Sequence, residues 1–130
     1  MNLASRISAL ASRVGLEVKT KIDATHPGVA RAWVCFGYVG NQMVVRALHN
    51  VASVTRTAAG RYRVTFATAM SDADYCWSAL ARSSTNSGTQ RFATVRASTD
   101  DKTPQHVDVR CTTAGGAATD STEINLVVYR

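Results

Sequence analysis

The chain has 130 residues, with 15 Lys and Arg against 9 Asp and Glu and a formal net charge of +6. This length suits one domain, and a composition of 45% hydrophobic and 18% charged residues lies outside the range of disordered chains. No apolar run approaches the roughly 20 residues that cross a bilayer, and Arg6 and Arg13 interrupt the apolar segment that a secretory signal needs, so we expect no membrane insertion.

An apolar stripe at helical spacing predicts one amphipathic helix over residues 3–22. Asn2 stands where its side chain can cap the first turn, and Lys19 and Lys21 suit the negative end of the helix dipole. A helix of about 20 residues is marginal alone in water, so the stripe must be buried on the chain's own β-domain, in a bundle of copies, or on a partner. The stripe consists of Leu3, Ile7, Leu10, Val14, Val18 and Ile22.

The segment after the helix reads as a hinge. Pro27 and Gly28 stand together there, and this pair ends a helix and lets the chain change direction. The hinge favours burial of the stripe against other copies or a partner protein. We therefore expect an N-terminal anchoring or oligomerisation helix in residues 1–24, a hinge in residues 25–29 and a β-sandwich domain in residues 30–130.

Beyond the hinge, apolar residues recur at every second position, which is the period of a half-buried strand. Gly40-Asn41 and Gly60 supply turns between such segments. Short strands with turns between them predict an all-β fold, an antiparallel β-sandwich of about seven or eight strands preceded by one helix. The predicted strands cover residues 31–36, 44–48, 51–56, 61–68, 74–82, 91–99, 106–112 and 123–130.

Two polar, low-complexity segments separate the later strands. Residues 83–90 and 112–122 are rich in Ser, Thr, Asn, Gly and Ala, so we expect exposed loops, and recognition would lie there. Trp33 and Trp77 are the candidate interface aromatics, because aromatic side chains on the outside of a strand favour subunit contacts.

Motifs for catalysis or cofactor binding are missing from the sequence. There is no C-x-x-C, G-x-S-x-G or Walker lysine, and the Asp72–Asp74 pair lacks the Gly and Glu of a calcium loop. Cys35, Cys76 and Cys111 are odd in number and widely spaced, which predicts free thiols in a reducing cytosol. We expect no catalytic residue, no cofactor and no metal, and hence no enzyme.

Positive charge is concentrated in the first half of the chain. Residues 1–71 hold nine Lys and Arg but two acidic residues. A basic surface of this kind can face nucleic acid or an acidic partner, but a solvated face is the simpler interpretation. The arginines stand singly and lack the aromatic ladder of single-strand binders, so we do not expect nucleic acid as a partner.

Several segments, taken in their order along the chain, resemble a β-domain common in bacteriophage tail-fibre and other virion-appendage proteins. Residues 31–36 carry its A-W-V-x-F strand, residues 46–54 its R-x-x-x-N-V-x-S-V segment, and residues 60–70 its G-x-Y-x-V-x-F-x-x-x-M strand. An acid-rich turn at residues 72–75 and the closing strand INLVVYR at residues 124–130 also match. Cys35 departs from the pattern, where the family often has Asn.

The resemblance implies a non-enzymatic virion protein, assembled in the host cytoplasm and usually trimeric. Its expected partners are its own copies, other tail, neck or capsid proteins, and a host-surface glycan. The first hypothesis is a small fibre subunit for host attachment. The second is a head-decoration (cement) or head-fibre protein that stabilises the shell, and the third is a carbohydrate-binding or glycan-cleaving module.

Overall fold

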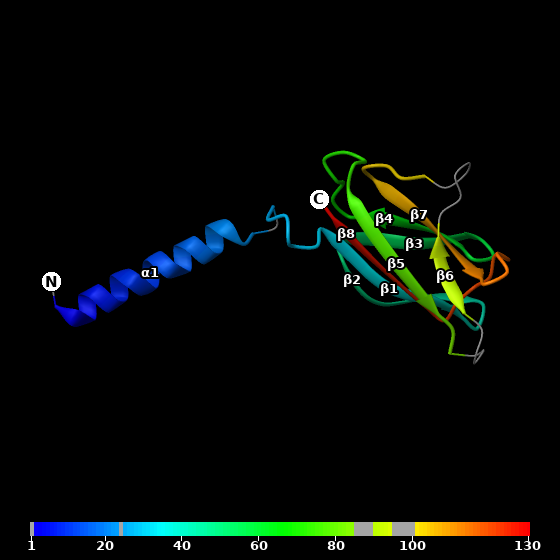
Figure 1. The fold of residues 1–130 in the computed structure, drawn as a ribbon, viewed down its shortest axis with the longest axis horizontal. Helices are drawn as coiled ribbons and strands as arrows, with labels where there is room; N and C mark the ends of the chain where they lie inside the picture. Colours follow the sequence, from blue (N-terminus) through cyan, green and yellow to red (C-terminus); the bar gives the residue numbers. More distant parts are fainter. Residues whose placement is uncertain (1, 24, 85–89, 95–100) are drawn as a thin grey trace.

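The computed structural model describes residues 2–23, 25–84, 90–94 and 101–130, and in this part of the chain one helix precedes eight strands (Figure 1). The elements are α1 (Leu3–Lys21), β1 (Ala32–Val39), β2 (Gln42–His49), β3 (Val51–Ala58), β4 (Arg61–Phe66), β5 (Cys76–Arg82), β6 (Arg91–Thr94), β7 (His106–Thr113) and β8 (Glu123–Tyr129). The all-β sandwich preceded by a helix is confirmed.

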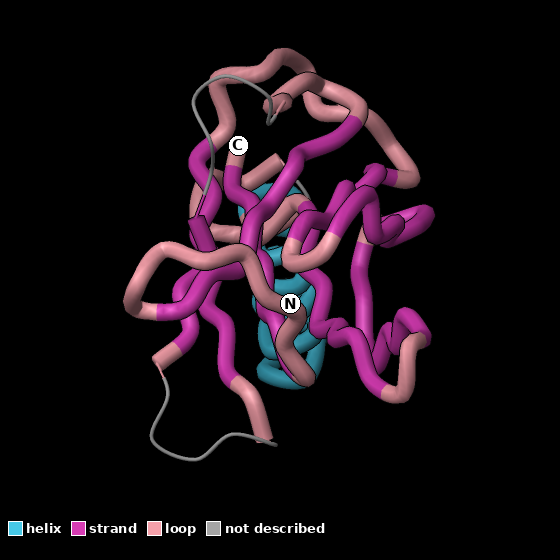
Figure 2. Tube along the Cα trace, turned by 90° about the vertical axis from the view of Figure 1, so that its right-hand side faces the viewer, coloured by secondary structure: helices cyan, strands magenta, loops and turns pink. Residues whose placement is uncertain are grey.

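Helix α1 begins at the predicted residue and ends at Lys21, one residue before the predicted end, with Ile22 as its C-cap. The Asn2 side chain accepts a hydrogen bond from the Ser5 N–H at 2.8 Å, and the basic residues of the last turn are Lys19 and Lys21. The helix leaves one end of the sandwich and extends away from it (Figure 1), and in the end-on view it lies behind the strands (Figure 2). Every described residue from 2 to 23 is exposed.

The segment between α1 and β1 is a series of local turns. The Asp23 carboxylate accepts from the N–H and hydroxyl of Thr25 at 2.7 and 2.6 Å, and the Gly28 N–H donates to Nδ1 of His26 at 3.0 Å. The His26 carbonyl accepts from the Val29 N–H at 3.0 Å. Bonds between near neighbours bend the chain at the predicted hinge.

The described strands form two antiparallel four-stranded sheets, one in the order β2-β1-β8-β5 (sheet A) and the other in the order β3-β4-β7-β6 (sheet B). The core lies between them because alternate residues of each strand point inward. Phe36 of sheet A meets Tyr62 of sheet B edge to face, with ring centroids 5.3 Å apart. The buried apolar residues also include Ala32, Val34, Val64, Phe66, Val107, Val109, Ile124, Leu126 and Val128.

Several predicted strand bounds differ from the observed ones, and β1, β2 and β3 run further than predicted, to Val39, His49 and Ala58. The strand predicted over residues 74–82 begins only at Cys76, and the strand over 61–68 ends at Phe66. The strand predicted over 91–99 is β6 as far as Thr94, and residues 95–100 lie outside the described part. The strand over 74–82 is shortened because Tyr75 turns into the core beside Phe66, at 5.7 Å between ring centroids, instead of continuing the ladder. The strand over 61–68 ends early because the N–H groups of Ala67 and Thr68 donate to Asn50 instead.

The turn before β4 makes a close contact that requires glycine. Gly60 has φ +64°, and an added Cβ would lie 2.5 Å from the Thr119 nitrogen and 2.6 Å from the Cys111 carbonyl oxygen. Gly40 has a similar φ of +59°, but an added Cβ would meet nothing within 4 Å. Both glycines have a left-handed backbone conformation, but Gly60 alone of the two has a close contact. Alanine substitutions at the two positions therefore separate the cost of the conformation from the cost of the contact.

We predict that Gly60→Ala lowers the free energy of unfolding by about 3 kcal/mol or more, because the methyl group displaces main-chain atoms of the neighbouring segment. Gly40→Ala should cost only about 1 kcal/mol, from the left-handed conformation alone. Urea unfolding followed by tryptophan fluorescence measures both. Equal losses in the two variants would contradict the close contact at Gly60.

Candidate functional site

The sandwich has two ends: the helix end, where the linker from α1 enters it, and the opposite end, which we call the far end. Strand β1 starts at the linker, and its other end leads into the Gly40-Asn41 turn, so this turn lies at the far end of the sandwich (Figure 1). The segment between β5 and β6 starts after Arg82, which pairs with Glu123 at the start of β8. The described start of the predicted 83–90 segment and the 112–122 segment therefore lie at the end opposite α1.

The predicted anchor residues of α1 form an exposed apolar stripe. Leu3, Ile7 and Leu10 are 72, 58 and 61% exposed, and Val14, Val18 and Ile22 are exposed to a similar degree. The opposite side of the helix carries short polar residues such as Ser5 and Ser12. The one ion pair within α1, Lys21 with Glu17 at 3.1 Å, is exposed at both partners and contributes little.

At the far end, the Asp120 carboxylate binds three groups of sheet B. Arg56 donates to both of its oxygens, at 3.0 and 2.8 Å. The Tyr62 hydroxyl and the Gly60 N–H donate to Oδ1 at 2.6 and 2.9 Å. Because Asp120 leads into β8 of sheet A, this cluster, which we call the Asp120 clamp, ties the two sheets together.

The clamp changes the acidity of its members. Burial raises the pKa of Asp120, but the hydrogen bonds from Arg56, Tyr62 and Gly60 outweigh this effect and hold the pKa at about 2. Burial and the bond to Asp120 raise the pKa of Tyr62 well above its usual range. At neutral pH the carboxylate is therefore charged, and the phenol keeps the proton that it donates. Tyr38 stacks on the Arg56 guanidinium, 4.4 Å from the ring centroid.

The predicted exposed loop over residues 112–122 needs correction. Ser121 is buried, Thr112 lies in β7 and is also buried, and the exposed part is confined to residues 114–118. The Thr119 N–H donates to the Cys111 carbonyl at 3.0 Å, and the Tyr38 N–H donates to the Ser121 carbonyl at 2.9 Å. Small polar residues are buried here because main-chain bonds and the Asp120 clamp satisfy them.

The other predicted recognition segment touches this one. The Ser84 N–H donates to the Thr122 hydroxyl at 2.8 Å, so the described start of the 83–90 segment lies beside the start of β8. Residues 85–89 lie outside the described residues. The two segments thus share one end of the sandwich.

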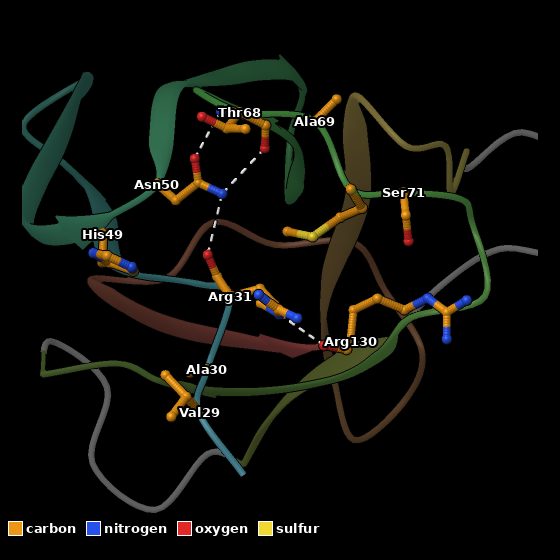
Figure 3. A pocket seen from close by; sticks show the side chains of 10 residues that line it. Val29, Ala30, Arg31, His49, Asn50, Thr68, Ala69, Ser71 and Arg130 are labelled. Carbon is orange, nitrogen blue, oxygen red and sulfur yellow. Dashed lines mark hydrogen bonds between the residues drawn. The ribbon is translucent and has the colours of Figure 1, made fainter. Parts of the chain in front are cut away.

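A pocket of about 520 Å³ opens at the helix end, between the linker and the segments at 49–50, 68–71 and 130 (Figure 3). Asn50, with φ +52°, donates from Nδ2 to the Arg31 and Thr68 carbonyls, both at 3.1 Å, and accepts the Thr68 N–H at 2.7 Å. Arg31 Nε donates to the Arg130 carbonyl at 2.7 Å. We call the Asn50 group the Asn50 clamp, because it ties the chain before β1 to the chain after β4.

Asp101, His106 and Asp108 are a cluster of metal-ligand types, with ligand atoms within 4.8 Å of one another. Arg63 occupies the cluster: it donates to the Asp108 oxygens at 2.8 and 2.9 Å and lies 3.4 Å from Asp101. Burial raises the pKa of Asp108, but Arg63 and the Asp101 N–H lower it more. A cation would have to displace the guanidinium, so this arrangement is an ion-pair network that holds residues 101–103 on β7.

The two tryptophans lie in different surroundings. Trp33 of β1 points outward and is 39% exposed, while Trp77 of β5 pairs with the inward Val128 and packs against the core. Cys76 is exposed, Cys35 half-buried and Cys111 buried, and all three are free. Of the two candidate interface aromatics, Trp33 is therefore the one available at the surface.

No protein-family model, curated protein or solved structure matches this chain. Among the described residues, no helix combines the length and the hydropathy needed to cross a bilayer.

Sequence reasoning missed both clamps. Asn50 is part of the N-V-x-S motif and the left-handed conformation is one that Asn tolerates, but its partners are distant in the sequence. Asp120 lies inside a low-complexity segment. It is the single acidic residue of residues 112–122, and this was the signal in the sequence that could have pointed to it.

We predict that acid destabilises the protein through Asp120. Because its folded pKa of about 2 lies below the ordinary value of 3.8, the clamp stabilises the fold above about pH 4, and this contribution is lost as the pH falls towards 2. The contribution at neutral pH is about 2 kcal/mol.

Urea unfolding of wild type and Asp120→Asn at about pH 7, 4 and 2.5 tests this. The variant should be less stable by about 1–3 kcal/mol at pH 7, and the two curves should converge in acid. A constant difference across the series would contradict the assignment of the low pKa to Asp120.

Proposed function

We propose that this chain is a structural subunit of a bacteriophage virion, a small trimeric fibre or appendage protein that displays its β-sandwich for attachment to the host surface. The observation that carries the proposal is the placement of its two surfaces. An apolar helix stripe is exposed at one end, and the exposed polar residues 114–118 and the described start of the 83–90 segment lie at the other.

The helix supplies the attachment to the assembly. Burying a large aliphatic side chain contributes about 1.5–3 kcal/mol, so six such residues left in water strongly favour association. Ala4 and Ala11 also lie in α1 and allow neighbouring helices to approach. The stripe repeats at about eleven residues, from Ile7 to Val18, which suits nearly straight bundled helices.

The far end supplies the display surface. The Asp120 clamp makes a rigid base there, and residues 114–118 project from it. Recognition commonly lies on loops that a rigid scaffold positions. Three copies on one threefold axis would turn weak single contacts with a host glycan into strong binding, because the later contacts form at high effective concentration.

The alternative function is a head-decoration or head-fibre protein that stabilises the capsid. The observation that favours it is the charge, since the net charge is +6 and the first 71 residues carry nine Lys and Arg against two acids. A basic surface of this kind would bind an acidic capsid surface through charge complementarity. Both functions place the protein in the virion, which assembles in the host cytoplasm.

Two binding measurements separate these functions. Salt-sensitive binding to purified heads that lack the protein supports decoration. Binding to host cells or to lipopolysaccharide, retained at moderate salt, supports a fibre. Release of oligosaccharides from host polysaccharide would contradict both and indicate a glycan-cleaving module.

We predict that Ile7→Asp combined with Val14→Asp abolishes oligomerisation and virion incorporation while the sandwich stays folded. The two carboxylates place charge in the middle of the stripe, and burying them costs several kcal/mol each. Light scattering gives the mass, and near-ultraviolet circular dichroism reports the fold.

The matched control is Ser5→Asp combined with Ser12→Asp, which adds the same charge to the opposite side of α1. The control should keep the wild-type mass and enter virions. If the stripe variant has the same mass as wild type and is still incorporated, the anchoring role of the helix is wrong.

A further inference from the structure

The two outward faces of the sandwich differ in chemistry. On sheet B, Arg63 lies directly across from Asp108, and Arg61 lies across from Arg110. Thr65 and His106 form the next pair on the same face. These positions are polar and charged, as expected of a surface in water, and the exposed aromatic on this side is Phe92 of the edge strand β6.

The outward face of sheet A is apolar at its centre. One cross-strand row runs from Trp33 through Val127 to Ser78, and the next from Cys35 through Asn125 to Leu80. These six residues, which we call the Trp33 face, border a hollow of about 330 Å³. Leu80 is 77% exposed, so it contributes almost nothing to its own domain's core.

The charges around the Trp33 face have partners within the chain. Arg82 pairs with Glu123 at 3.0 Å, and Arg130 pairs with Asp72. Arg46 donates to the Thr122 carbonyl at 2.8 Å. A neighbour that covers the centre therefore meets two ion pairs and one arginine that is hydrogen-bonded to a main-chain carbonyl, whereas two sheet B faces would bring arginines together.

We propose that the Trp33 face is a second self-association surface, on which the sandwich of a neighbouring copy docks. This inference rests on the proposed assembly of several copies through α1. A charge-poor centre with an exposed aromatic and a leucine, and charged residues confined to the rim, is the composition of a subunit interface. The tether favours it, because β1 follows the linker directly and bundled helices would raise the local concentration of the sandwiches.

A sugar ligand fits this face less well than a second copy. Tryptophan can stack on a sugar ring, but hydroxyl groups need several hydrogen-bonding partners around it. The polar side chains of the Trp33 face are Ser78 and Asn125, and Asn125 already donates to Glu123 at 3.2 Å. The valine, leucine and cysteine that complete the face match an apolar partner.

The test uses the full chain and the reactivity of Cys35, which lies within the face. A bulky maleimide is added, and peptide mass spectrometry follows each cysteine separately, with buried Cys111 as the internal reference. The variant is Leu80→Asp, which places a charge at the centre without removing a core residue. The matched control is Phe92→Asp on the outward side of sheet B, where Phe92 is 45% exposed.

The proteins are compared at a concentration about tenfold above the dissociation constant for self-association of the wild type. Cys35 should then react roughly tenfold more slowly in wild type and in Phe92→Asp than in Leu80→Asp. Trp33 emission should shift to longer wavelength in Leu80→Asp. Equal Cys35 rates in all three proteins, while light scattering shows the full oligomer, would overturn this inference and leave the helix assembly intact.

The helix variant distinguishes failure of the proposed assembly from failure of this face. In Ile7→Asp with Val14→Asp, Cys35 protection that rises with protein concentration supports the face even if the helix has no role. Protection that appears only on adding a host oligosaccharide, and not with concentration in wild type, would overturn self-association in favour of a glycan site.

Discussion

Two polar clamps hold the sandwich closed at its opposite ends, and the surfaces of the protein depend on them. At the helix end, Asn50 is the single residue between β2 of sheet A and β3 of sheet B, and it bonds to chain segments next to both sheets. At the far end, Asp120 leads into sheet A and binds three groups of sheet B. Between the clamps, an apolar core supplies the bulk of the stability without directional bonds. The helix leaves the sandwich at the end of the Asn50 clamp, and residues 114–118 lie at the end of the Asp120 clamp.

Most of the residues that carry the resemblance to virion β-domains lie in this core. Tyr62, Val64, Phe66 and Met70 are the Y-x-V-x-F-x-x-x-M residues of that pattern, and all four are buried. Its Asn is the centre of the Asn50 clamp. These residues explain the sandwich, and a sandwich is compatible with many functions. Support for a virion role therefore comes from elsewhere, from the exposed helix stripe and from the end that faces away from it.

The helix stripe and the Trp33 face are two apolar surfaces of one chain that its own fold leaves in water. Isolated exposed apolar residues are common, but contiguous patches indicate interaction sites. The two surfaces are joined by a short linker into β1, so association at one raises the effective concentration at the other. The polar, arginine-rich outside of sheet B is then the side directed to solvent or to an acidic neighbour.

The sequence alone determined the elements whose signal is local: the helix with its Asn2 cap, the alternation that turns Val34 and Phe36 inward and Trp33 outward, and the turns at Gly40 and Gly60. It also placed the stripe on one side of the helix. Only the tertiary structure decided that Asp120 is half-buried in a hydrogen-bonded ion pair, that Asn50 joins the segment before β1 to the segment after β4, and that Trp77 packs against the core. The physical reason is distance along the chain. Asp120 reaches Arg56 and Gly60 across 64 and 60 residues, and no periodicity or turn signal encodes a partner so far away.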